Sequence, residues 1–471
     1  TAIGIASMAS NTTASDNVAV GGDSLNANTT GASNVAVGVG ALVANTTASN
    51  NTAVGKRALY ANTTGASNTA VGKGAGDAIT TGSNNVAMGE GALSTEDTGG
   101  RSVAIGVNSL GQQNVNGNVY NTAVGHAAGN NVTTGIGNAL IGGLAGDALT
   151  DADYNVAVGI NSLSNDTLGS RSTAIGAGAL FTQNFTSATT TYNVAVGYDA
   201  GFAITTGFQN TFIGGFAGDG TNDAVGNVAI GYNALSANCA DDNVAVGKEA
   251  LRNCTTQRNT AMGWQAGASV NSGNENVIIG YDAADYAGNL TTGGSNVYVG
   301  AYARSSSVSV STEIAIGRYV LGQGALTATL GVSGNGATIS IDGSDTSWSA
   351  HSDERLKENI TSSTAGLSFI NDLRPVTYNW KAKNAISEDF THYYDSDSTD
   401  PVNGVAGKTY HGFIAQEMKA TIDAHSEVEN GNNLWAERVD DIQQLAPSNL
   451  VPMLTKAIQE LSAQVDALTA R

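Results

Sequence analysis

The sequence predicts a mainly β protein, in which a parallel β-roll or solenoid of 17-residue repeats precedes a small α+β domain that ends in a coiled-coil helix. Three observations lead to this fold class. A five-residue block ending in glycine recurs at a nearly constant spacing before residue 320. All but five of the 60 glycines precede residue 350, whereas all four prolines follow it. Near the C-terminus, apolar residues alternate at spacings of three and four, which is typical of a coiled coil.

The repeated block has the form Asn-(Val/Thr)-Ala-(Val/Ile)-Gly, as in residues 34–38 and 51–55. Its closing glycines run from Gly4 to Gly317, and thirteen of the eighteen intervals between them are 17 residues long. Alternating small apolar side chains predict a short strand, and the glycine predicts a turn with positive φ. A disordered low-complexity linker, the alternative, would not keep this register.

Other columns of the repeat are equally regular. Ala or Ser usually stands three residues after the closing glycine, Leu or Gly four residues after it, and Asn four residues before it. Such columns predict a coil in which each residue lies above the same residue type of the neighbouring turn. Asn side chains would form hydrogen bonds from rung to rung or within a turn. At ~4.8 Å per rung the stack would form a rod on the order of 90 Å long.

The predicted coil is thin, and its side chains are small. One chain would bury too little apolar surface to stand alone. We therefore expect several chains around a shared axis, with the Val/Ile and Leu columns facing that axis.

The ValAlaValGly and ThrAlaIleGly blocks resemble the head region of trimeric autotransporter adhesins, a left-handed parallel β-roll in which three chains wind together. The resemblance extends over residues 2–317. It implies a homotrimer, which the repeat spacing alone does not. The usual period here, 17 residues, is longer than in those heads.

Three longer intervals place extra residues at 111–120, 181–192 and 285–295. Loops on a rigid scaffold often carry binding sites, and aromatic residues are frequent around the second of these loops. Phe181, Phe185 and Tyr192 are therefore candidate receptor contacts that would stack on sugars. The alternative is that these rings fill a locally wider core.

Two cysteines lie in consecutive repeats. Cys239 follows Gly231 by eight residues and Cys254 follows Gly247 by seven. On adjacent rungs their Cα atoms would lie within disulfide range, and a bridge would indicate an oxidising compartment; two buried thiols are the alternative. No His or second cysteine pair lies nearby, so we expect no metal site here, and we expect no cofactor anywhere in the chain.

The repeat rule ends near residue 320, and residues 337–341 alternate like a strand. We therefore predict three parts: a repetitive β-roll at 1–320, a β linker at 321–351, and a separate domain at 352–471. Four motifs mark the last part in order: SDERLKENI at 352–360, LRPVTYNW at 373–380, HGFIAQE at 411–417, and LVPML at 450–454 leading into AIQEL at 457–461. Together they resemble the intramolecular chaperone domain at the end of endosialidase-type phage tailspikes and many tail fibres.

This resemblance implies a domain that trimerises, templates folding of the fibre, and is then released by self-cleavage at a serine. The matching nucleophile is Ser352 and the matching base is Lys357. Ser-Lys pairs are an established variant of serine nucleophiles, provided that burial keeps the lysine neutral. On spacing alone, these two residues would be part of a solvated turn. The chain would be at most a single-turnover serine autoprotease, without activity on other molecules.

The C-terminal heptad pattern predicts a helix that begins near Ser448, with Pro452 in its first turn. Its a and d positions are the predicted trimerisation contacts; a lone helix packed on its own domain is the alternative. These positions are Val451, Leu454, Ile458, Leu461, Val465 and Leu468.

Charge and hydropathy limit the function classes. The net charge is −20, with 10 basic and 22 acidic residues before residue 350, so nucleic-acid binding is not expected. No signal peptide is evident and no apolar run could span a bilayer, so membrane insertion is not expected either. Because the sequence starts at Thr1, we expect a preceding N-terminal part.

These observations predict a homotrimeric tail fibre on a virion tail. Its partners would be a host surface glycan or protein receptor and, through the preceding part, other virion tail proteins. One alternative is a trimeric adhesin on a bacterial cell surface, which would need a membrane-anchoring barrel. The other is a polysaccharide-degrading tailspike, which would need paired carboxylates in a groove.

Overall fold

The computed structural model describes residues 1–286, 290–333, 335–344, 354–389, 393–428, 434–437 and 442–470. The chain forms two compact units, Thr1–His351 and Ser352–Arg471. The predicted Ser352 lies outside the described residues. Among the described residues, no helix has the length and apolar character needed to cross a membrane.

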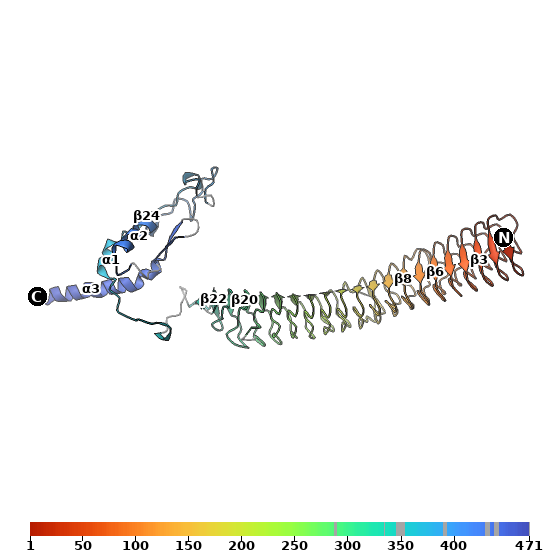
Figure 1. Ribbon diagram of the computed structural model, residues 1–471, viewed down its shortest axis with the longest axis horizontal. Coiled ribbons are helices and arrows are strands. Elements are labelled where there is room, and N and C mark those ends of the chain that lie inside the picture. The colour runs from red at the N-terminus through yellow and green to blue at the C-terminus, as the bar shows by residue number, and fades with distance from the viewer. Residues whose placement is uncertain are drawn as a thin grey trace. The chain divides into compact units, whose positions relative to one another are not determined.

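The N-terminal unit is a β-solenoid in which each coil supplies one short strand, and Figure 1 shows these strands stacked along it. Each strand ends immediately before a closing glycine and pairs in parallel with the strands of the coils on either side, so that Ala36 lies beside Ala53. The predicted solenoid of 17-residue turns is confirmed. Its strands are β1 (Ala2–Ile3), β2 (Val18–Val20), β3 (Val35–Val37), β4 (Thr52–Val54), β5 (Thr69–Val71), β6 (Val86–Met88), β7 (Val103–Ile105), β8 (Thr122–Val124), β9 (Ala139–Ile141), β10 (Val156–Val158), β12 (Thr173–Ile175), β14 (Val194–Val196), β15 (Thr211–Ile213), β16 (Val228–Ile230), β17 (Val244–Val246), β18 (Thr260–Met262), β19 (Val277–Ile279), β20 (Val297–Val299) and β21 (Ile314–Ile316).

The closing glycines are required by the stacking itself. Gly38 has φ of +132°, and a Cβ placed on it would lie 2.5 Å from the carbonyl oxygen of Gly55 in the next coil. An L side chain fits neither this backbone conformation nor this space. The predicted positive φ of the column is therefore confirmed.

Each chain closes a core of its own. The central alanines of the strands, such as Ala36 and Ala53, and the leucines of the Leu column, such as Leu42 and Leu59, are fully buried within the single chain. The expectation that the Leu column faces a shared axis is therefore wrong. These leucines occupy left-handed turns (φ of 51° at Leu42) and lie inside the coil, whereas the outer residues of the strands remain partly exposed.

The core keeps its width by compensating substitutions. Where the strand centre carries Leu140, Phe212 or Ile278, a neighbouring position of the Leu column is glycine. A Cβ on Gly201 would lie 2.8 Å from the ring of Phe212, and one on Gly146 would lie 2.8 Å from Leu140. The Leu and Gly variants of this column are therefore packing partners of the strand centre.

Buried asparagines bond the coils to one another. The backbone N–H of Asn34 donates to Oδ1 of Asn17 at 2.8 Å, and Asn51 repeats this bond to Asn34 at 2.9 Å. A second buried column behaves similarly, since Nδ2 of Asn45 donates to Oδ1 of Asn28 at 2.8 Å. The predicted rung-to-rung bonding is confirmed, and it satisfies polar groups that lie away from water.

Two further pairs complete this unit. The short strands β11 (Gly169–Ser170) and β13 (Thr189–Thr190) pair in parallel beside the second insertion. In the predicted linker, β22 (Thr327–Val332) continues the solenoid sheet beyond β21 and forms an antiparallel hairpin with β23 (Asn335–Ser340).

The C-terminal unit is small and mixed. It contains η1 (Glu354–Leu356), α1 (Leu367–Asp372), β24 (Val376–Tyr378), η2 (Lys383–Ala385), β25 (Tyr410–Gly412), α2 (Ala415–Ala424), β26 (Trp435–Glu437), β27 (Gln443–Leu445), η3 (Pro447–Leu450) and α3 (Val451–Thr469). The pairs β24–β25 and β26–β27 are antiparallel. Phe369 of α1, Met418 and Ile422 of α2 and Leu450 of η3 form its core. The predicted C-terminal helix is confirmed.

Candidate functional site

The outer face of the solenoid sheet carries a long apolar column. In every three-residue strand from β2 to β21 the third residue is Val, Ile or Met, and the two-residue strand β1 ends in Ile3. Several of these side chains are 36–48% exposed: Met88, Ile105, Ile141, Ile175, Ile213, Ile230, Met262 and Ile316. A continuous stripe of this kind is typical of an interaction surface, unlike isolated exposed apolar residues.

The three aromatic candidates do not form one patch. Phe185 is buried, and its backbone N–H donates to Oδ1 of Asp166 at 3.0 Å. Phe181 stacks on Phe202 with ring centroids 5.1 Å apart. Tyr192 alone is well exposed, at 54%. Phe185 therefore fills the core, as in the alternative interpretation, whereas the ring of Tyr192 is available to a ligand.

Cys239 and Cys254 are free and buried in this structure, which corresponds to the alternative of two thiols. Sγ of Cys239 lies 3.1 Å from Oγ1 of Thr221. Burial raises the pKa of Cys239 to about 12 and also raises the pKa of Cys254. Both thiols are therefore held in their unreactive, protonated form.

The long helix α3 presents the predicted heptad positions to solvent. Its exposed fractions are 60% at Val451, 42% at Leu454, 66% at Ile458, 50% at Leu461, 49% at Val465 and 70% at Leu468. We call these six residues the α3 stripe. Among the described residues of the helix only Ala457 is buried, and it borders this stripe, three residues after Leu454 and four before Leu461.

Another side of α3 is attached to α1. Oε2 of Glu460 accepts a hydrogen bond from the backbone N–H of Leu367, the first residue of α1, at 2.8 Å. Gly366, which precedes α1, provides no side-chain cap, so Glu460 satisfies a helix N-terminus that would otherwise lack an acceptor. This bond and the neighbouring Lys456 lower the pKa of Glu460.

One histidine joins two segments of the C-terminal unit. Nε2 of His425 lies 2.8 Å from Oδ2 of Asp372, and Nδ1 lies 2.9 Å from Oε1 of Glu427. The two carboxylates, Glu427 first, raise the pKa of His425. The imidazole also packs edge-on against Phe369, 5.4 Å between centroids. His425 thus links the end of α1 to the end of α2.

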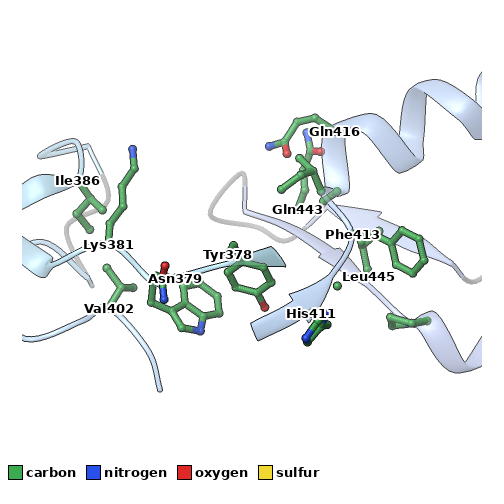
Figure 2. Close-up of a pocket in the computed structure, with 15 residues that line it drawn as sticks. Tyr378, Asn379, Lys381, Ile386, Val402, His411, Phe413, Gln416, Gln443 and Leu445 are labelled. Carbon is green, nitrogen blue, oxygen red and sulfur yellow. The ribbon is translucent and has the colours of Figure 1, made fainter. Parts of the chain in front are cut away.

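A groove of about 710 Å³ lies between the two strand pairs. Figure 2 shows Tyr378 of β24 and His411 of β25 along it, with Phe413, Gln416 and Leu445 nearby. The residues that line it carry mostly aromatic, aliphatic and amide side chains, and none of them carries a carboxylate. These lining residues therefore offer no acid–base pair for cleaving a glycosidic bond.

The predicted cleavage pair is only partly described. Lys357 follows η1, its side chain is exposed, and its backbone N–H donates to the carbonyl oxygen of Glu354 at 3.0 Å. The Ser352–Lys357 geometry lies outside the described residues. Within the described ranges there is no group of three or more His, Cys, Asp or Glu side chains that could hold a metal ion.

Residues 352–426 match the family model described as the chaperone of endosialidase. No curated protein and no solved structure matches the chain. The matched segment contains α1, β24, β25 and α2, and therefore most of the C-terminal core. The endosialidase-chaperone segment thus follows a β-solenoid, and α3, with its exposed stripe, comes after it.

Proposed function

We propose that the chain forms the shaft and host-adhesion part of a homotrimeric tail fibre on a virion, and that its C-terminal unit drives trimerisation and folding. The observation that carries this proposal is the α3 stripe. Six apolar side chains at heptad spacing are exposed on a helix that follows an endosialidase-chaperone segment. Three copies of α3 would bury these side chains against one another.

The repetition within the solenoid is the reason why a separate trimerising unit would be needed. Successive coils place Ala on Ala and Val on Val, as in β2, β3 and β4. A neighbouring chain shifted by one coil would meet almost the same surface, so the shaft alone specifies its register weakly. Because α3 occurs once per chain, a trimer nucleated there starts in a single register.

The outer column of the solenoid sheet supplies the second part of the interface. Its Val, Ile and Met side chains carry no charge, and they would be covered when three shafts lie side by side. Each coil would add only a small apolar contact. Repeated over the whole shaft, these contacts would make dissociation slow once the register is set.

We further propose that assembly permits self-cleavage. The hydroxyl oxygen of Ser352 would attack an adjacent peptide carbonyl while neutral Lys357 accepts its proton. The C–N bond of that peptide would then break, with Lys357 returning the proton to the leaving amine. Water would hydrolyse the resulting ester to a carboxylate and restore the Ser352 hydroxyl. A lysine acts as a base only when its neutral form is populated, and burial favours that form. Since Lys357 is exposed in the single chain, neighbouring chains of the trimer would have to cover it.

The test compares the full chain with a chain that ends at residue 351. Light scattering should give three times the 47.4 kDa chain mass for the full protein, or three times that of the shaft if the C-terminal unit has been released. The truncated chain should aggregate. A soluble, correctly wound trimer from the truncated chain, or a monomeric full chain, would contradict the proposal. Adsorption of the purified trimer to host cells tests the adhesion part separately.

A further inference from the structure

The solenoid contains one hydrogen-bonded module twice, four coils apart. In the first copy Glu96 is fully buried. Its carboxylate accepts hydrogen bonds from the backbone N–H of Gly99 at 2.7 Å and from Nε2 of Gln113 at 2.9 Å. Gln113 also donates to Oγ of Ser102 at 2.8 Å and accepts from Nδ2 of Asn121 at 2.9 Å.

The second copy repeats this arrangement around Asp166. Its carboxylate accepts from the backbone N–H of Gly169 at 3.1 Å and from Nε2 of Gln183 at 2.5 Å. Gln183 donates to Oγ of Ser172 at 2.9 Å and accepts from Nδ2 of Asn193 at 2.8 Å. Acid, glycine, serine and glutamine are each 70 positions beyond their counterparts in the first copy.

Each module holds an inserted loop against the coil. The backbone N–H of Val115 donates to Oε2 of Glu96 at 3.4 Å, and that of Phe185 donates to Oδ1 of Asp166 at 3.0 Å. Both loops are therefore fixed from inside by a buried carboxylate, whose own hydrogen-bonding capacity is filled. The loops end at Tyr120 and Tyr192.

Arginine also recurs in the modules, at the turn immediately before the strand. This turn is left-handed in every coil, and in the first coils it holds small polar residues, as at Ser33 (φ 60°) and Asn50 (φ 64°). In five of the six coils between residues 101 and 192 it holds bulky ones instead, and in the sixth it holds Gly137. The bulky residues are Arg101, Tyr120, Tyr154, Arg171 and Tyr192, with φ of 52–65°.

These five residues form what we call the Arg–Tyr stripe. Its rings are open to solvent, with 56% of Tyr120, 52% of Tyr154 and 54% of Tyr192 exposed. The guanidinium carbon of Arg101 lies 5.5 Å from the centroid of Tyr120, and that of Arg171 lies 5.6 Å from the centroid of Tyr154. Gly137 occupies the same turn in the coil between those of Tyr120 and Tyr154. It leaves room for Tyr154, since a Cβ on Gly137 would lie 2.6 Å from the ring.

The two stripe arginines differ from others on the shaft. Arg57, Arg252 and Arg258 each form an ion pair with a carboxylate. Among the described residues, Arg101 and Arg171 form none: Arg101 bonds the hydroxyl of Tyr120, and Arg171 bonds Oγ1 of Thr190 at 3.1 Å. Both guanidinium groups therefore keep donors for an outside anion on an otherwise acidic molecule.

We propose that the Arg–Tyr stripe binds a linear saccharide chain that bears carboxylates, with Arg101 and Arg171 each taking one carboxylate and the tyrosine rings packing on sugar faces. A carboxylate matches the planar fork of a guanidinium. The arginines lie four coils apart, about 19 Å along the shaft at ~4.8 Å per coil, so an extended chain of several sugars reaches both. Nucleic acid does not fit, because two arginines on an acidic shaft cannot offset its charge.

This inference rests on the proposed adhesion function and names its ligand class. The test measures binding of the full-length trimer to immobilised polygalacturonate, alginate and hyaluronan, with carboxyl-reduced polygalacturonate and poly(glycerol phosphate) as comparisons. At least one of the three acidic polysaccharides should bind. The Arg101→Gln/Arg171→Gln variant should bind it at least about tenfold more weakly, since hydrogen bonds to charged groups are lost.

Arg57→Gln is the matched control, because Arg57 also lies over a tyrosine ring, 4.2 Å from Tyr60, but outside the stripe; its binding should not change. Four results would each overturn the inference: no binding to any of the three, equal binding to the carboxyl-reduced polymer, unchanged binding by the double variant, or preference for poly(glycerol phosphate). If the protein is trimeric and adsorbs to host cells but fails these assays, the proposed function stands and this inference does not.

Discussion

Oε2 of Glu460, on α3, accepts a hydrogen bond from the backbone N–H of Leu367 at 2.8 Å, although the two residues lie 93 positions apart. This bond fixes α3 on the endosialidase-chaperone segment and leaves the apolar stripe facing outward. This polar contact therefore contributes to holding α3 in the orientation that leaves the stripe exposed.

Replacing Glu460 with Gln should loosen this attachment. The charge that favours the α1 N-terminus is lost, so the C-terminal unit should unfold at a lower temperature while the solenoid transition stays unchanged. Because the folded pKa of Glu460 is lowered, its contribution is present above the unfolded value of about 4.3 and disappears as pH falls through the lower folded pKa. Calorimetry at pH 7 and pH 3 measures both effects. Asp466→Asn, the same charge change on the same helix, is the control and should have little effect.

The α3 stripe should determine the oligomeric state. Ile458→Glu together with Leu461→Glu places two charges per chain where apolar side chains would meet. Each lost apolar contact costs about 2 kcal/mol, so three chains should dissociate at micromolar concentration. Sedimentation velocity should find monomers, whereas the exposed Gln459→Glu control should remain trimeric. A trimeric double variant would show that α3 does not hold the chains together.

Much of the solenoid could be predicted from its sequence because its contacts repeat every coil. The glycine and asparagine columns report constraints that act between identical positions, as at Gly38 and Asn34. Which way the leucines face could not be predicted, because it depends on the left-handed turn at positions such as Leu42. The contact of Glu460 with Leu367 and the bond of Gln113 to Glu96 join residues that no local pattern connects.

The closing glycines make a sharp test of the stacked coils. Gly38→Ala forces an L residue to φ of +132° and places a methyl group against the carbonyl of Gly55. The backbone strain alone costs about 1–3 kcal/mol, so hydrogen exchange in residues 18–55 should accelerate. Gly143→Ala is the matched control, since a Cβ there has no neighbour within 4 Å. Equal exchange in the two variants would contradict the stacking.

His425 should make the C-terminal unit sensitive to pH near neutrality. Glu427 and Asp372 raise its folded pKa, so its stabilising contribution is fully present below the unfolded value of about 6.5 and is lost as pH rises through the folded pKa. The melting temperature of this unit should therefore fall more between pH 6 and pH 9 in the native chain than in His425→Gln. Parallel pH profiles would exclude this role for His425.

Self-cleavage should require both the serine and the assembled state. Ser352→Ala removes the proposed nucleophile and Lys357→Met removes the proposed base, so a denaturing gel should show one intact band for each variant and two fragments for the native chain. Trimerisation should persist in both variants, because neither residue belongs to the α3 stripe. If exposed Lys357 becomes a base only when neighbouring chains cover it, the Ile458→Glu/Leu461→Glu chain should also stay intact. Mass spectrometry that finds the same fragments in Ser352→Ala would refute the assignment of the nucleophile. Fragments from the dissociated Ile458→Glu/Leu461→Glu chain would show that cleavage does not require assembly.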